Sequence, residues 1–196
     1  YMAMKAQADN GRPVEGFREL TIFPGVEISV SGGFHLLALF DPDAATRKVT
    51  DLLATVRYQG NEGASDGVTR QGPEIVVQSV LEAGGIPIPA HADQDKGLLR
   101  VKPATRECAL DANTVRQIVE IEGLLGVEWL YAGSQPPQCV EGSCKHLARV
   151  LGSDCHSFQG SAVPGSRYTW VKMAKPTLEG LRLALLDGNG ISIRRS

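Results

Sequence analysis

The chain has 196 residues, of which 42% are hydrophobic and 21% are charged. This composition is ordinary for a globular protein and long enough to bury one sizeable core, so we expect a single domain over residues 1–196. The formal net charge of -2 excludes a global electrostatic attraction for nucleic acid or anionic membranes, so any anionic substrate must be held by local groups.

The targeting signals and the cysteines indicate the compartment. The sequence contains neither an apolar run of about 18 residues nor a signal-peptide pattern, so we expect a cytoplasmic protein without a membrane span. The four cysteines form no C-x-x-C pair, which favours reduced thiols over a disulfide framework. A zinc site on Cys139 and Cys144 is the less favoured interpretation.

The pattern of residues 21–83 predicts two strands and two helices. Residues 21–30 (TIFPGVEISV) and 34–40 (FHLLALF) are apolar or β-branched and flank a Gly-Gly turn, so they predict adjacent strands. Helical spacing of apolar residues follows at 47–58 and at 73–83, where Pro73 suits a first helical turn. The polar stretch 59–72 between them predicts a loop.

The rest of the chain, from residue 86 onward, continues the alternation of strands and helices. The predicted elements are a short strand at 86–92, a loop at 93–107, a helix at 112–122, a strand at 126–131, a helix near 141–150, a strand that ends in LGSDCH (151–156), an extended segment at 166–173 and a helix at 176–187. Such alternation predicts parallel strands with crossover helices, in a barrel or an open sheet.

Three of the predicted strands contain a glutamate or a histidine that is a candidate functional residue. Glu27 projects from an apolar strand, His35 opens the next strand, and His91 ends the run IPIPAHA. A buried carboxylate needs a cation as partner, which favours a metal site. The alternatives are an exposed edge-strand glutamate, a core histidine with its hydrogen bonds satisfied, and a solvated histidine at a strand end.

Asp154 and His156 form a fourth candidate group, in the stretch LGSDCHSFQG. Residues two apart in a strand point to the same side, so this spacing aims a carboxylate and an imidazole at one point. The five candidates are all nitrogen or oxygen donors near predicted strand ends, which suits zinc, manganese or iron. His146, beside Lys145 on a predicted amphipathic helix, is expected to be solvated.

The segments PGVEIS, FHLLALF, IPAHAD and LGSDCHS, in this order, resemble the later motifs of the PHP (polymerase and histidinol phosphatase) family. The resemblance implies an α/β fold, a distorted (β/α)7 TIM-like barrel, with two or three divalent metal ions at the carboxyl ends of its strands. It places the metal ligands on Glu27, His35, His91, Asp154 and His156. The family's H-x-H and T-D-H motifs do not occur in the chain, so we expect them, with the N-terminal strand or strands of the barrel, upstream of Tyr1.

The resemblance implies a metal-dependent phosphoesterase. Arg167, in a local basic stretch with Lys172 and Lys175, is a candidate phosphate-binding residue or, alternatively, part of a solvated strand face. The substrate would be a phosphorylated small molecule or a nucleic acid. A second interpretation is a nuclease or nucleic-acid-sensing module, because the C-terminal segment resembles the end of PHP domains that precede an AAA- or SMC-like ATPase, as in TrlF-type proteins. No phosphate-loop motif occurs in the chain itself. A third interpretation is a degenerate barrel kept as an interaction scaffold.

Overall fold

The computed structural model describes residues 2–61, 63, 67–188 and 190–196. Its central element is an antiparallel sheet in the order β1-β2-β5, made of β1 (Gly25–Val30), β2 (Phe34–Leu39) and β5 (Ile86–Pro89). Gly32 and Gly33 have φ angles of 111° and 89° in the turn between β1 and β2, a backbone conformation that favours glycine. This tight turn makes the first two strands a hairpin.

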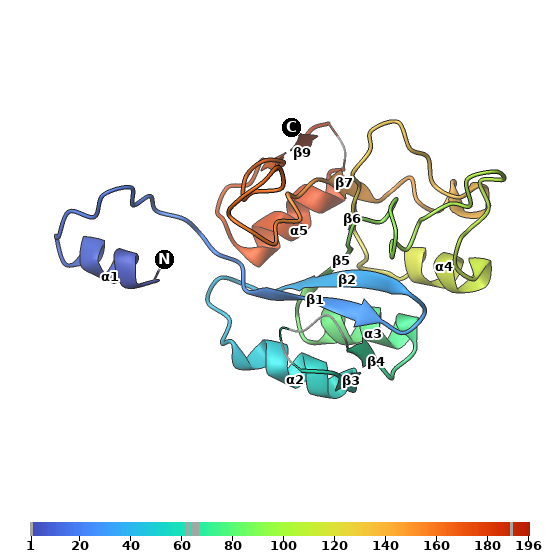
Figure 1. The fold of residues 1–196 in the computed structure, drawn as a ribbon, viewed down its shortest axis with the longest axis horizontal. Helices are drawn as coiled ribbons and strands as arrows, with labels where there is room; N and C mark the ends of the chain where they lie inside the picture. The colour runs from blue at the N-terminus through green and yellow to red at the C-terminus, as the bar shows by residue number, and fades with distance from the viewer. Residues whose placement is uncertain (1, 62, 64–66, 189) are drawn as a thin grey trace.

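The two faces of this sheet are covered differently. Ile28, Val30, Phe34 and Leu36 are buried on one face, in the same cluster as the buried side of α3 (Pro73–Glu82). On the opposite face Leu37 and Leu39 pack in a second cluster with apolar side chains of β5 and of α5 (Leu178–Leu186). Figure 1 shows α3 and α5 on opposite sides of the strands. The strict alternation of side chains along a strand produces both layers.

Three further helices complete the helical part of the described residues: α1 (Met2–Asp9), α2 (Arg47–Thr55) and α4 (Ala112–Val119). Two of the helices, α4 and α5, begin with a side-chain cap. The Asp111 side chain accepts a hydrogen bond from Thr114 N at 2.8 Å and caps α4, and the Thr177 side chain accepts one from Gly180 N and caps α5. Helix α1 projects away from the rest of the molecule (Figure 1).

Three two-stranded sheets lie around this centre. They are β3 (Tyr58–Gln59) with β4 (Val68–Thr69), β6 (Gly126–Glu128) with β7 (Ala148–Val150), and β8 (Thr169–Val171) with β9 (Ile193–Arg195). A short 3-10 helix, η1 (Gln138–Val140), precedes β7. Only the β6–β7 pair is parallel among the strands of the described residues.

The expected (β/α)7 TIM-like barrel is therefore wrong. The described residues form separate sheets of three, two, two and two strands, and these sheets do not close into a barrel. A parallel pair needs a crossover of a dozen or more residues, whereas β1 and β2 are joined by the short turn at Ser31–Gly33, which imposes antiparallel pairing. The apolar runs correctly indicated strands, but strand pairing depends on the connections.

Most predicted elements form with shorter bounds, and three regions differ, one of which is the predicted strand at 151–156, where the structure has no strand. The predicted helix near 141–150 is wrong, because 141–147 are turn residues and 148–150 form β7. Two short strands lie at the edges of the predicted loop 59–72, of which residues 62 and 64–66 lie outside the described part. The helices of the described part are too short or too polar for any of them to cross a bilayer.

Candidate metal centre

The β1–β2 hairpin brings a glutamate and a histidine together. Register pairs Ser29 with His35 and Glu27 with Leu37, so Glu27 and His35 are diagonal neighbours on one face of the sheet. Their side chains meet, with 2.6 Å between Glu27 Oε1 and His35 Nδ1. This is the face that α5 covers over Leu37 and Leu39, and it stays partly open at Glu27, whose side chain is 35% exposed.

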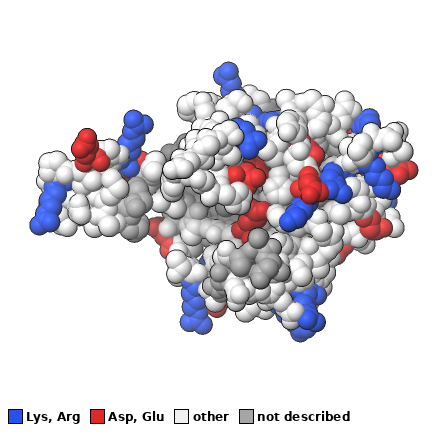
Figure 2. Space-filling model, viewed as in Figure 1, with Lys and Arg blue, Asp and Glu red and all other residues white. Residues whose placement is uncertain are grey.

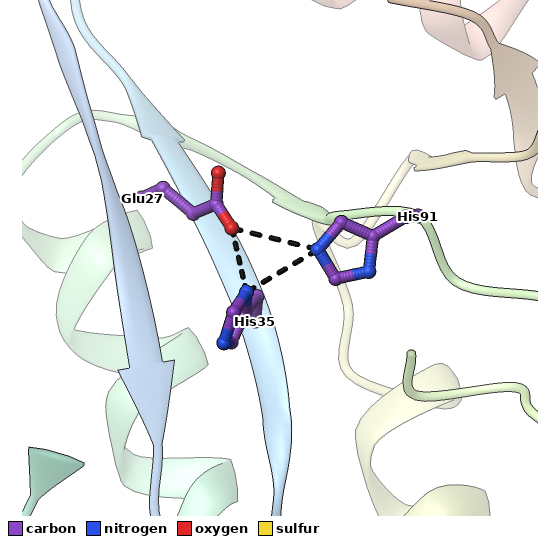
Figure 3. Close-up of side chains that lie close together, drawn as sticks. All are labelled: Glu27, His35 and His91. Atoms are coloured by element: carbon purple, nitrogen blue, oxygen red, sulfur yellow. Dashed lines mark hydrogen bonds and ion pairs between the residues drawn. The ribbon is translucent and has the colours of Figure 1, made fainter. Parts of the chain in front are cut away.

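His91 enters the same group from the chain that follows β5. The backbone of His91 has a φ of 31°. Hydrogen bonds of the two neighbouring residues hold this backbone in place: Ala90 N donates to His35 O at 3.0 Å, and Ala92 N donates to Glu128 O at 2.7 Å. The His91 Nε2 atom lies 3.2 Å from His35 Nδ1 and 3.5 Å from Glu27 Oε1. Figure 3 shows the three side chains pointing toward one another from three neighbouring segments.

The ligand atoms of these three side chains form a group that could hold a metal ion. One ligand atom from each lies within 4.8 Å of the other two, and this is the only such cluster of three found among the described residues. Two ligand atoms that are each about 2.1 Å from a tetrahedral ion lie about 3.4 Å from each other. The distances from His91 Nε2 to His35 Nδ1 and to Glu27 Oε1, 3.2 Å and 3.5 Å, are close to this value. The 2.6 Å contact of Glu27 with His35 is shorter and is a hydrogen bond.

The cluster also changes the acidity of its members. The pKa of the Glu27 carboxyl is lowered, mainly by its hydrogen bond with His91 and further by His35, against the opposing effect of partial burial. The pKa of His91 is raised, mainly by the Glu27 hydrogen bond, and the charges of Glu27, Asp154 and Glu128 add to this effect. Without a metal the group therefore favours a negative carboxylate beside a protonated imidazole.

The cluster lies in the wall of a cavity of about 770 Å³. The described residues that line this cavity are Val26, Glu27, Ser29, His35, Leu53, Tyr58, Gly63, His91, Gln94, Asp95, Lys96, Leu130, Asp154 and His156. All five sequence-predicted ligands thus face one cavity. Figure 2 shows acidic and basic side chains interspersed over the face viewed.

Asp154 and His156 line the cavity but stand apart from the other three. They form a pair, with 3.3 Å between Asp154 Oδ1 and His156 Nε2, and the His156 side chain is 86% exposed. Strand β7 ends at Val150, and Asp154 has a φ of 47°, so the prediction that both residues lie at a strand end is wrong. The glycine at 152 and the left-handed backbone at Asp154 belong to an irregular loop.

Sequence reasoning missed Glu128, which connects this loop to His91. Glu128 is only 6% exposed; its Oε2 accepts a hydrogen bond from His91 N at 2.8 Å, and its Oε1 accepts one from Gly152 N at 3.1 Å. A side chain at position 152 would come within 2.6 Å of Glu128 Oε1, so the glycine permits this approach. The available signal was a glutamate inside the apolar run GVEWL, the same signal that identified Glu27.

Arg167 supports the same loop from outside the cavity. Its guanidinium Nη2 donates to the carbonyl of Ser153 at 3.1 Å, and Arg167 is not among the described residues that line the cavity. Lys96, which is exposed and does line the cavity, is the better placed cation for an anionic substrate.

Comparison with protein-family models, with curated proteins and with solved structures finds no match to this chain. The resemblance to PHP motifs therefore stays a prediction from the sequence. The functional interpretation depends on the geometry of the Glu27, His35 and His91 cluster and of the cavity around it.

Proposed function

We propose that Glu27, His35 and His91 bind a divalent zinc, manganese or iron ion, and that the surrounding cavity hydrolyses a phosphate ester. The observation that carries this proposal is the convergence of one carboxylate and two imidazoles, from β1, β2 and the segment after β5, in the wall of one cavity. Nitrogen and oxygen donors in this mixture suit these metals. When bound, such an ion lowers the pKa of water and offsets negative charge on phosphoryl oxygens.

The other cavity residues supply what the three ligands do not. Asp154 and His156 present a second carboxylate and a third imidazole to the same space, which are donors for a further ion or for a proton transfer. The Lys96 ammonium is available to pair with a phosphate oxygen. Glu128 has a supporting role, because its carboxylate accepts hydrogen bonds from the backbone N–H groups of His91 and Gly152.

Two further parts of the proposal come from the sequence. The order of the four motifs that resemble the PHP family supports a phosphoesterase, although the fold is not the barrel which that resemblance implied. The four cysteines form no C-x-x-C pair in the sequence, which favours a compartment that keeps thiols reduced, the cytoplasm.

The test is divalent-dependent hydrolysis. The chain is freed of metal with a chelator, supplied with manganese, zinc or iron(II), and assayed on p-nitrophenyl phosphate, on bis-p-nitrophenyl phosphate and on a single-stranded oligonucleotide. We expect hydrolysis that requires added metal and disappears in His35→Ala. The matched control is His146→Ala, because His146 is an exposed histidine outside the cavity.

The substrate panel separates the three interpretations. Preference for the small esters supports the phosphoesterase proposal. Preference for the oligonucleotide, with binding that weakens steeply as salt is added, supports instead the nuclease or nucleic-acid-sensing module of a larger ATPase. Metal binding at background level and no hydrolysis with any metal contradict the proposal and leave an interaction scaffold.

A further inference from the structure

Two cysteines that are distant in sequence meet on a part of the molecule that the proposed function does not use. The sulfur atoms of Cys108 and Cys139 are 2.8 Å apart, although 31 residues separate them in the chain. Cys108 is buried and Cys139 is exposed. Both line a cavity of about 590 Å³ that is separate from the candidate metal centre.

The backbone holds both thiols in place through contacts that do not involve sulfur. Cys108 pairs with Val101 in an antiparallel bridge, which anchors the segment that precedes α4. Gln138 N donates to Arg106 O at 3.1 Å, which connects this segment to η1. The Arg106 guanidinium also donates to the carbonyl of Pro136 and to the Glu141 carboxylate, each at 3.1 Å. The short distance between the sulfurs thus follows from two docked segments.

We propose that Cys108 and Cys139 are a dithiol site that closes reversibly to a disulfide. A disulfide needs a separation of about 2.0 Å between the sulfurs, so closure requires a movement of less than about 1 Å. This inference is independent of the proposed hydrolysis, because neither cysteine lines the cavity of the metal centre.

The oxidant is a small-molecule disulfide such as oxidised glutathione. The exposed Cys139, as thiolate, attacks one sulfur of the oxidant, forms a mixed disulfide and expels one thiol. The Cys108 thiolate then attacks the Cys139 sulfur and expels the second thiol. Two protein thiols are oxidised to one disulfide, and one disulfide of the oxidant is reduced to two thiols, so hydrogen atoms and electrons balance.

Cys144 is the obvious competitor, and its surroundings disfavour it. The Cys144 side chain packs against the main core, whereas the sulfur of Cys108 lies 2.8 Å from that of Cys139. Burial raises the pKa of the Cys108 thiol to about 12, so the exposed Cys139 is the first of the pair to attack the oxidant. In the described residues these thiols form no cluster of three that would hold a metal ion, so the contact is a pair.

The test is the pairing of thiols after oxidation of the folded chain. The protein is incubated with oxidised glutathione, the remaining thiols are blocked with N-ethylmaleimide, and the chain is cut with trypsin and with a Glu-specific protease. These cuts place Cys108 in residues 108–116, Cys139 in residues 129–141 and Cys144 in residues 142–145. We expect a linked pair of peptides 108–116 and 129–141, which separates when dithiothreitol is added.

Two variants and one condition make the result decisive. Cys139→Ser removes the linked pair, whereas Cys144→Ser, the matched control, leaves it unchanged. In urea the nearer cysteines, Cys139 and Cys144, pair preferentially, because the shorter loop costs less entropy to close. A bond between Cys139 and Cys144 in the folded chain, or a glutathione adduct on Cys139 that persists without a linked peptide, contradicts the proposal.

Discussion

The two halves of the candidate site are held in different ways. Glu27 and His35 project from a hydrogen-bonded hairpin whose register fixes which side chains are neighbours. Asp154 and His156 lie in an irregular loop whose contacts to the body of the molecule include Glu128 and Arg167. Glu27 and His35 of the hairpin half lie within hydrogen-bonding distance of each other. Asp154 and His156 of the loop half pair with each other and line the same cavity. A strand positions a ligand through its register, whereas a loop needs added buried contacts.

The largest effect is expected from removing a ligand of the hairpin half. His35→Ala deletes one of three donors, and metal affinity measured by calorimetry should fall by more than about 100-fold, since loss of groups that merely support a ligand already costs 10- to 100-fold. His146→Ala should leave the affinity unchanged. Equal affinities in the two variants would mean that the hairpin half does not hold the metal.

The next largest effect concerns the residue that joins the two halves. Glu128→Gln replaces one acceptor oxygen by an amide that faces a backbone N–H, so it should lower the free energy of unfolding by about 1–3 kcal/mol in urea titration. Because His91 loses its backbone support, metal affinity should fall by about 10- to 100-fold. Glu122→Gln, on an exposed glutamate, should change the unfolding free energy by less than about 0.5 kcal/mol.

A smaller effect on binding is expected from the loop half. Asp154→Asn removes a charge at the edge of the cavity, and metal affinity at the three-residue cluster should fall by less than about tenfold, corresponding to about 1.4 kcal/mol. Hydrolysis should nevertheless be lost by a larger factor, because the second carboxylate no longer faces the substrate. Steady-state kinetics beside calorimetry checks this split, and parallel losses would place Asp154 with the other three ligands.

The smallest expected effect is a dependence of folding stability on pH. The pKa of His91 is raised above its usual 6.5, so the stability from its protonated pairing is present below 6.5 and is lost as pH rises through the raised value. The pKa of Glu27 is lowered below its usual 4.5, so its contribution to stability is present above pH 4.5 and is lost as pH falls through the lowered value.

Metal binding requires neutral His91, so the rise in unfolding temperature on adding metal should grow as pH rises above 6.5. A rise that stays constant with pH would contradict metal binding through His91.

The sequence predicted the two strands of the hairpin half well, because a strand depends on local pattern. Alternating apolar residues and the Gly-Gly turn indicated β1 and β2, and a carboxylate on an apolar strand indicated Glu27. The prediction of a barrel was wrong because the direction in which strands pair depends on the connections between them. The apolar pattern of each strand does not specify these connections.

The conformation of the loop half and the contact between the two thiols could not be predicted from local sequence pattern. The spacing of Asp154 and His156 was interpreted as a strand, whereas the backbone turns left-handed at Asp154. Glu128 gave the same signal as Glu27, but its partners are backbone groups from distant segments. The meeting of Cys108 and Cys139 depends on the docking of η1 against the segment at Arg106, which no short motif encodes.

Metal content per chain is the most direct test of a metal centre on Glu27, His35 and His91. Elemental mass spectrometry is done on the protein purified without chelator, beside His35→Ala and His146→Ala prepared in the same way. We predict at least one equivalent of zinc, manganese or iron in the wild-type chain and in His146→Ala, and a small fraction of that in His35→Ala. The same trace amount in all three proteins would contradict a metal centre on Glu27, His35 and His91.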